Sequence, residues 1–482
     1  MKAKTLNQCN PDYRDDEIED HTALYEGGQA FHDRITRFLP KNANEPDDLY
    51  TDRKSRATYE NLGGPLVDMI GAWLFSKPAQ IDGLDEEWIE DVDRQGTAIN
   101  DWFRALFTDA LVSRRSWCWI DLPAVVGPAP TSLADEEAMG LRAPYLVRIP
   151  PHAVRNWGED DLGRLTWVMA RTKFTRQADP LAPQQRVTRW TLIDATTIRR
   201  WEYVDDPARP LTDETDVGEL PAIAHNIGAM PVVRMVLPAG LYAMQKLCDP
   251  LLALTRTAND HDWTLHIAAH ALMTLTTSEG ANVRPVVGAG YYLGLTRDGD
   301  GKDEVGYAEP GGASNASRFE RIKDLRESVH RVVQQMAAST ASDGQGQTSA
   351  ASKMADWASL EVMLSAYASI VRTALEQVLD LVAGILRAPD PKVSGLAGWQ
   401  EDDLADLVNA YSIAAPSVKS PTFRKEMAKR LAGAFLPDLP PEVRVVVDRE
   451  IDAADYADPE VYPAVGAMPG AGSGGNDAGV AE

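Results

Sequence analysis

STASDGQGQTSAAS, residues 339–352, is the stretch that decides the fold, because it separates two long segments with the periodicity of helices in a chain of 482 residues. The segment before it opens at Ser317 with Ser-Arg-Phe-Glu, a capping box that satisfies free backbone N–H groups at a helix start. The segment after it, Lys353 to Arg387, carries a longer apolar stripe. The stretch itself has one charge, Asp343, and no aromatic residue. Since long loops inside compact domains tend to be functional, it predicts two rigid helices joined by a nearly uncharged functional loop.

Composition sets the broad class of protein. A hydrophobic content of 44% is enough for real cores, and the length predicts two to four domains. The 72 acidic residues outnumber the 48 basic ones, giving a net charge of −24, which argues against a protein that grips nucleic acid by neutralising phosphates. Three distant cysteines favour reduced thiols over a disulfide framework. With no secretory signal, and with its longest weakly charged apolar stretch (Val362 to Val371) too short for a bilayer, we expect a soluble intracellular protein without a membrane partner.

The first half of the chain predicts helices followed by strands. Helical stripes cover residues 51–77 and 85–112, and Gly63-Gly64-Pro65 either interrupts the first or marks a junction between two helices. A β-rich region follows, which we expect to form an antiparallel meander with one further strand at Pro231 to Leu237. The strands of the meander are expected at Trp117–Leu122, Pro144–Ile149, Leu165–Phe174, Arg186–Ile193 and Thr197–Val204.

The second half is mainly helical. A long helix is expected from Leu241 to Thr274, kinked or started by Pro250, and a shorter one at 422–436 after Ser420-Pro421. Short strands are expected between the long helices, at Val283–Val287 and Tyr291–Leu295. From residue 437 the chain has ten acids against two bases, and its Gly- and Ala-rich end is expected to be disordered. The fold class is α+β, mainly α.

Asp262, His266 and His270 stand at i, i+4 and i+8 of one expected helix, a spacing that can bind zinc. The Glu of a metalloprotease helix is absent, since Ile-Ala-Ala follows His266. Polar contacts with a neighbouring helix are therefore the preferred interpretation. A metal-dependent hydrolase that uses these three residues is kept as an alternative.

Other motifs of catalysis or cofactor binding fail on spacing. Asp298, Asp300 and Glu309 match three positions of a calcium loop, but Asp303 stands where glycine is required. Gly288, Gly290 and Gly294 do not fit the Gly-x-Gly-x-x-Gly spacing, no Walker lysine follows a Gly-rich loop, and there is no Gly-x-Ser-x-Gly elbow. The tryptophans lie on helical or strand stripes and are expected in the core. The sequence predicts no catalytic residue, no metal and no cofactor, and favours a protein that is not an enzyme.

Four stretches together resemble the portal proteins of tailed bacteriophages. They cover most of residues 50–390, and their order along the chain carries the likeness. They are Tyr59-Glu-Asn61 through Phe75-Ser-Lys77-Pro78; Pro144-Tyr145-Leu146 with Pro151, Val154 and Asn156-Trp157; Asn226-Ile-Gly228 with Met230-Pro231-Val232-Val233; and the helix, loop and long helix at 317–387.

The resemblance implies a ring, usually of twelve subunits, at one capsid vertex of the virion, assembled in the host cytoplasm. Double-stranded DNA would pass through it non-specifically during packaging and ejection. The implied partners are the large terminase subunit, neck or adaptor proteins, and the major capsid and scaffolding proteins. The portal fold implies a wing at 1–240, helical and then β-rich; stem helices at 241–274 and 315–338; a small α/β clip at 275–314; a tunnel loop at 339–352; wing and crown helices at 353–436; and an acidic tail at 437–482.

In that mapping the loop would touch DNA as it slides. Small hydroxyl and amide side chains make weak contacts with phosphate, whereas a run of arginines would bind it and slow it. The residues expected to face the channel are Ser339, Thr340, Asp343, Gly344, Gln345, Gly346, Gln347 and Thr348. A head–tail adaptor or minor capsid protein is the alternative within the same structural class.

Overall fold

The computed structural model shows a mixed α+β protein in which about half of the described residues are helical and all strand pairs but one are antiparallel. It forms two compact units, Met1–Trp399 and Gln400–Glu482. In the described part of the chain, no helix combines the length and apolar character that crossing a membrane requires. The structure describes residues 1–123, 135, 140–268 except 178, 207 and 226, 272–277, 292–296, 304–308, 312–337, 350–397, 399, 418, 420–436 and 441–454.

The first unit begins with short helices that supply much of its core. The stripe over 51–77 falls in two helices, so the alternative that Gly63-Gly64-Pro65 marks a junction is confirmed. α6 starts at this glycine pair, and a Cβ on Gly64 would come within 2.6 Å of the Tyr25 carbonyl oxygen. The stripe over 85–112 is also two helices, with a loop between them. The helices are α1 (Ala3–Leu6), α2 (Asp15–Glu26), α3 (Gly28–Asp33), α4 (Ile35–Phe38), α5 (Asp47–Ser55), α6 (Gly63–Phe75), α7 (Glu86–Glu90) and α8 (Ile99–Ser113).

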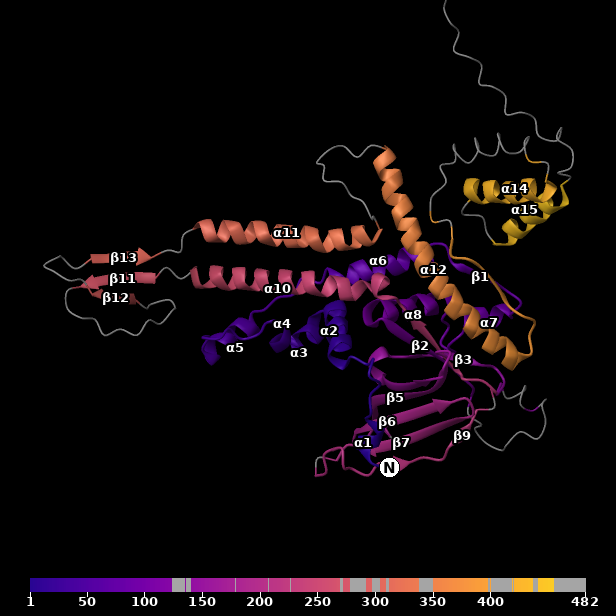
Figure 1. Cartoon of the computed structure of the whole chain (residues 1–482), viewed down its shortest axis with the longest axis horizontal. Coiled ribbons are helices and arrows are strands. Elements are labelled where there is room, and N and C mark those ends of the chain that lie inside the picture. Colours follow the sequence, from indigo (N-terminus) through magenta and orange to yellow (C-terminus); the bar gives the residue numbers. More distant parts are fainter. Residues whose placement is uncertain are drawn as a thin grey trace, which may run out of the picture. The chain divides into compact units, whose positions relative to one another are not determined.

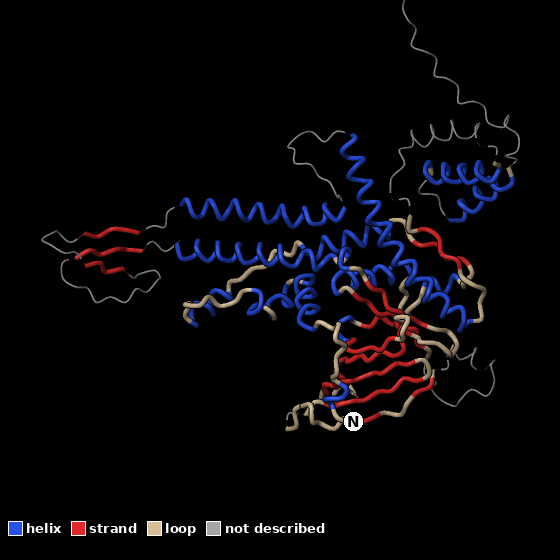
Figure 2. Tube along the Cα trace, in the orientation of Figure 1, coloured by secondary structure: helices blue, strands red, loops and turns tan. Residues whose placement is uncertain are grey.

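Two antiparallel sheets follow, where one meander was expected (Figure 2). The first two expected strands, β2 (Arg115–Asp121) and β3 (Tyr145–Ile149), pair instead with the later β10 (Val232–Val236) in the order β10-β2-β3. The meander proper starts at β4 (Val154–Glu159), which the sequence pattern missed and whose pairing with β5 is bulged. Its remaining strands are β5 (Leu165–Arg176), β6 (Gln185–Asp194), β7 (Thr197–Val204) and β8 (Gly218–Glu219), with β9 (Ile223–Ala224) pairing to β7.

Tryptophans fill the cores on both faces of the meander sheet, as expected. Trp117 packs with Val168 and Ile193 in a cluster that includes residues of both sheets. On the opposite face Trp190 and Trp201, both fully buried, pack with residues of α1. The larger helical core is built mainly from α6, α8 and the long helices α10 (Ala243–Ala268) and α12 (Ala350–Leu386).

The long helices differ from their expected bounds. α10 ends at Ala268, and the residues expected to continue it to Thr274 fall partly in the strand β11 (Leu272–Thr277), because Leu-Met-Thr-Leu-Thr-Thr suits a strand as well as a helix. Ser317 lies inside a helix and does not cap it, since α11 spans Gly312–Ala337. β12 (Tyr292–Thr296) runs parallel to β11, and β13 (Glu304–Ala308) antiparallel to it. The expected strand Val283–Val287 lies outside the described residues. After α12, β14 (Lys392–Gly395) pairs with β1 (Ala79–Asp82).

The second unit contains two described helices, α14 (Pro421–Phe435) and α15 (Pro441–Ala453). The expected start of α14 is confirmed, because the Ser420 side chain accepts a hydrogen bond from the Phe423 N–H at 3.3 Å. Lys425 and Lys429 both pair with Asp452 of α15, at 3.0 and 2.8 Å. The expected disordered tail, residues 455–482, lies outside the described residues.

Candidate functional site

The most distinctive feature of the first unit is a pair of long helices, α10 and α11, which lie side by side (Figure 1). Each has 26 residues, which corresponds to about 39 Å at 1.5 Å per residue. Arg318, near the start of α11, donates to the hydroxyl of Thr264, near the end of α10. The two helices are therefore antiparallel, and strands β11–β13 lie between them in sequence. We call α10 and α11 together the stalk.

Among the side chains of α11 that the structure describes, one stripe is buried. Ile322, Leu325 and Val329 are buried, at the spacing of one helix face. Apolar side chains also remain on the outside: Phe319 is 49% exposed and Leu265 on α10 is 43% exposed. The rest of the outer surface of α11 carries charges of both signs. Two paired helices with one shared stripe leave further faces for a neighbour.

A buried amide fastens α10 to the chain that precedes α6. Asn259 is 5% exposed, and its Oδ1 accepts the Thr58 N–H at 2.9 Å while its Nδ2 donates to the Thr58 carbonyl at 2.8 Å. The same Nδ2 lies 2.7 Å from the Thr255 carbonyl of its own helix. One side chain thus satisfies both backbone groups of a residue that belongs to no helix or strand.

Arginines fasten the same part of the stalk to the N-terminal segment. Arg53 of α5 forms a buried ion pair with Glu45, with Nε–Oε1 at 2.8 Å, and this hydrogen bond holds the pKa of Glu45 below its usual range. Arg256 of α10 donates to the Phe38 carbonyl at 2.8 Å, and Arg326 of α11 pairs with Glu60 at 2.8 Å. Segment 38–60 therefore contacts both helices of the stalk.

The start of α10 is fixed by buried hydrogen bonds. The hydroxyl of Tyr242 lies 2.6 Å from His21 Nδ1 of α2 and 3.1 Å from the Val112 carbonyl. Burial lowers the pKa of His21, so this imidazole is held neutral. From α12, the Tyr367 hydroxyl donates to the carbonyl of Leu241, at 2.7 Å, just before α10 begins.

The metal-site alternative gains no support from the residues that are described. Asp262 and His266 line a cavity of about 190 Å³ together with Arg53 and Arg56, whose guanidinium groups repel a cation. His270, the third candidate, lies outside the described residues. Within the described ranges, no group of three or more His, Cys, Asp or Glu residues could hold a metal ion.

The expected DNA-channel loop falls entirely outside the described residues, so its eight candidate residues, Ser339 to Thr348, stay a prediction. The helices that bound it are described. α11 ends at Ala337, and α12 begins at Ala350, slightly before the expected Lys353. The order of helix, loop and longer helix is thus confirmed for its two helices.

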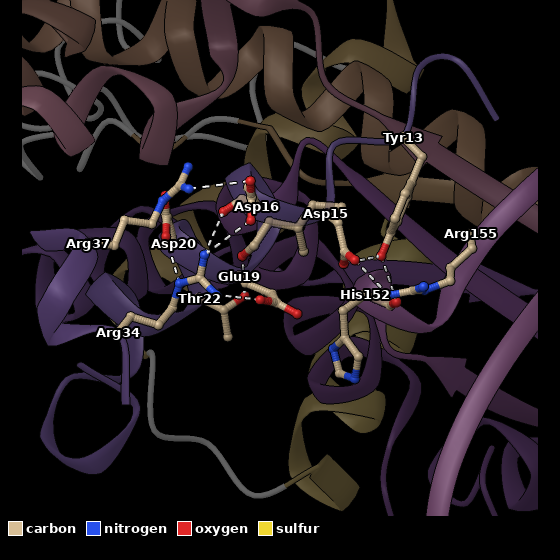
Figure 3. A network of polar contacts seen from close by, with 11 residues as sticks. Tyr13, Asp15, Asp16, Glu19, Asp20, Thr22, Arg34, Arg37, His152 and Arg155 are labelled. Carbon is tan, nitrogen blue, oxygen red and sulfur yellow. Dashed lines mark hydrogen bonds and ion pairs between the residues drawn. The ribbon is translucent and has the colours of Figure 1, made fainter. Parts of the chain in front are cut away.

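An ion-pair network that sequence reasoning missed lies at the start of α2 (Figure 3). Arg34 and Arg37 both pair with Asp20, and Arg155 of β4 pairs with Asp15 at 2.6 Å. The acidic cluster is visible in the sequence. Its partners are not, because they lie on other elements, as far away as position 155.

Comparisons with known proteins return only remote structural likeness. No protein-family model and no curated protein matches the sequence. A chain from the virion of a native gene transfer agent particle is 12% identical, with a TM-score of 0.38, over 89% of this chain and 98% of that one. A chain from the neck of an empty gene transfer agent particle, computed with C6 symmetry, is also 12% identical, with a TM-score of 0.38, over 83% and 97%.

Proposed function

We propose that this chain is the subunit of a portal ring, a non-enzymatic conduit for double-stranded DNA at a capsid vertex. The observation that carries the proposal is the stalk: two antiparallel helices of 26 residues with a small β module between them, followed from Ala350 by a 37-residue helix that returns through the core. This order matches what the sequence resemblance implies for stem, clip, tunnel loop and wing. Terminase, neck and capsid proteins are the partners proposed with it.

The surface of the stalk supports assembly into a ring. A two-helix pair buries apolar area on one side only, and burial of a large apolar side chain is worth about 1.5–3 kcal/mol. Phe319 and Leu265 remain about half exposed in the single chain. Lateral packing of identical stalks would cover both side chains and place opposite charges of neighbouring copies in contact.

The loop between Ala337 and Ala350 is the part proposed to meet DNA. Its composition is small, amide-rich and nearly uncharged. Such a surface contacts phosphate without adding the salt-dependent affinity that each neutralised phosphate brings. The net charge of −24 per chain, multiplied around a ring, would repel a duplex from the walls.

Electron microscopy of the purified full-length chain tests the ring. We expect circular particles with a central hole in negative stain, whose abundance rises with protein concentration. The double variant Phe319→Asp, Leu265→Asp is expected to stay folded and monomeric, because it places charge on the lateral faces. The matched control Leu181→Asp alters a leucine that is 96% exposed in a β-hairpin turn, and should still form rings. A wild-type chain that stays monomeric at all concentrations would refute the proposal.

A packaging assay tests the loop separately. Replacing Gln345 and Gln347 by Arg is expected to slow DNA translocation while rings still form, since two added cations per subunit would bind phosphate. The control replaces the same two residues by Asn, which keeps the amides. Equal packaging rates for the Arg and Asn variants would show that the loop does not contact DNA.

A further inference from the structure

The meander sheet carries a cationic cavity that the proposed function does not use. The side chains of directly paired residues lie on the same face of the sheet. On one face of β5, β6 and β7, Arg171 pairs with Trp190, Lys173 pairs with Thr188, and Thr188 pairs with Tyr203. The first half of this face is apolar and covered by α1. From Arg171 onward it becomes polar. There it lines a cavity of about 720 Å³, within the size range of ligand sites.

Among the described residues, the cations of this cavity form no ion pair, although Asp205 and Asp206 also line it. Arg171, Lys173 and Arg186 all line it, and none of them forms an ion pair with any described residue. The Asp15 carboxylate raises the pKa of Arg171, but it already pairs with Arg155 at 2.6 Å. The remaining carboxylates of the lining belong to exposed residues at the end of β7.

Arg171 is the strongest sign that this face binds a ligand. Its guanidinium carbon lies over the buried ring of Trp190, 5.5 Å from the ring centroid, in a cation–π contact. Its Nε is buried and has no hydrogen-bond partner among the described residues. A buried donor without an acceptor is costly, and a half-buried cation without an anion more so. Burial accordingly lowers the pKa of Arg171.

We infer that this cavity binds a carboxylate-bearing peptide segment of a partner protein. Its cations supply charge-assisted hydrogen bonds, and Gln184 and Gln185 can bond a peptide backbone. Val204, Pro210 and Leu211 line the same space and offer apolar contact to neighbouring side chains. The mixture of charged, amide and apolar groups fits a peptide better than a bare oxyanion.

A nucleic acid fits this cavity less well. Asp205 and Asp206 lie at the end of β7 and line the cavity. Two carboxylates would repel a run of phosphates, but they tolerate a peptide whose acidic residues are spaced along it. The inference is independent of the ring, because every residue that lines the cavity lies in or beside one sheet of a single chain.

Fluorescence anisotropy on the full-length chain tests the inference. The probes are a labelled short peptide of Asp and Glu separated by Gly and Leu, and its counterpart with Asn and Gln in place of the acids. We expect the acidic peptide alone to bind, and more weakly at high salt. The double variant Lys173→Gln, Arg186→Gln should weaken binding at least about tenfold, the size expected when charge-assisted hydrogen bonds are lost.

The matched control removes one lysine and one arginine elsewhere. Lys77→Gln with Arg164→Gln changes the net charge equally, at two exposed positions away from the cavity, and should bind the peptide like the wild type. Arg171→Gln is a second variant, expected to weaken binding further. The inference is overturned if the amide peptide binds as tightly, if both double variants lose binding equally, or if inorganic phosphate or a single-stranded oligonucleotide binds there and the acidic peptide does not.

Discussion

Asn259→Leu is the most informative single perturbation of the stalk. Leucine keeps roughly the volume of the buried side chain and removes both hydrogen bonds to Thr58, at 2.9 and 2.8 Å. Each such bond contributes about 0.5–1.5 kcal/mol net. Because Thr58 itself is exposed, water can reach its freed N–H and carbonyl groups. The two losses therefore sum to about 1–3 kcal/mol, with no larger desolvation cost added.

Hydrogen exchange followed by mass spectrometry reads this loss directly. The Thr58 amide is protected by one identified acceptor, so its opening free energy should fall by the full amount. A loss of 1–3 kcal/mol corresponds to exchange that is about five- to 150-fold faster in the peptide spanning residues 56–62. The start of α10, held by Tyr242, should keep its protection. Urea denaturation should show the same loss in unfolding free energy.

Gln245→Leu is the matched control for this experiment. It makes the same change from an amide to an apolar side chain on the same helix, at an exposed position. Surface changes of this kind stay within about 0.5 kcal/mol. If exchange at residues 56–62 were as slow in Asn259→Leu as in the wild type, the contact between segment 38–60 and the stalk would not depend on the Asn259 amide. That result would refute the prediction.

Three further predictions follow from buried or strained positions. Burial lowers the pKa of His21, so the unfolded chain binds the proton at a higher pH than the folded chain does. The free energy of unfolding should therefore fall as pH drops below about 6.5, by at most about 1.4 kcal/mol per pH unit. Denaturation measured from about pH 5.5 to 7.5 should show no such contribution in His21→Gln. Glu45→Gln removes the nearer anion of the buried Arg53, which keeps only Asp260 at 3.8 Å; it should cost about 1.5–3 kcal/mol in the same assay, the range for hydrogen bonds to charged groups, whereas a loss below about 1 kcal/mol would contradict a buried pair. Gly395 has φ +82°, and a Cβ there would come within 2.4 Å of the Pro78 carbonyl oxygen, so Gly395→Ala should lower the melting temperature and loosen β1–β14; an unchanged melting temperature would show that this turn tolerates a side chain.

The sequence predicted those helix starts and strands that are determined by residues close together in the chain. Ser420-Pro421 marks the start of α14 because a hydroxyl that caps a helix needs only the next three residues. β7 lies at its expected bounds, Thr197–Val204, because this run is rich in β-branched and aromatic residues, which suit a strand. The glycine pair at 63–64 marks a junction for another local reason: the Tyr25 carbonyl oxygen approaches the backbone of Gly64 so closely that the residue there can have no Cβ.

Pairing and burial over long distances could not be predicted from one sequence. From the sequence, β2 and β3 are expected in the meander. In the structure β2 pairs with β10, more than a hundred residues later, and the three strands form a sheet of their own. Asn259 looks like any polar residue on a helix, and its role comes from Thr58, which belongs to no periodic element. In the sequence, Arg171 is an ordinary polar residue of an alternating strand. Its contact with the Trp190 ring and its buried Nε, which has no hydrogen-bond partner among the described residues, become visible only once β5 and β6 are paired.

The hydrogen bond from Tyr367 to the Leu241 carbonyl has a mechanical consequence. α12 is an unbroken helix of 37 residues, about 56 Å long, and from Leu360 onward its inner face is embedded in the core. A helix of this kind does not shorten under load, so a push or pull on its first turn travels along its length as a rigid displacement. Tyr367 then passes that displacement to the residue that precedes α10. Force applied at the first turn of α12 would therefore reach the residues that precede α10, at the start of the stalk.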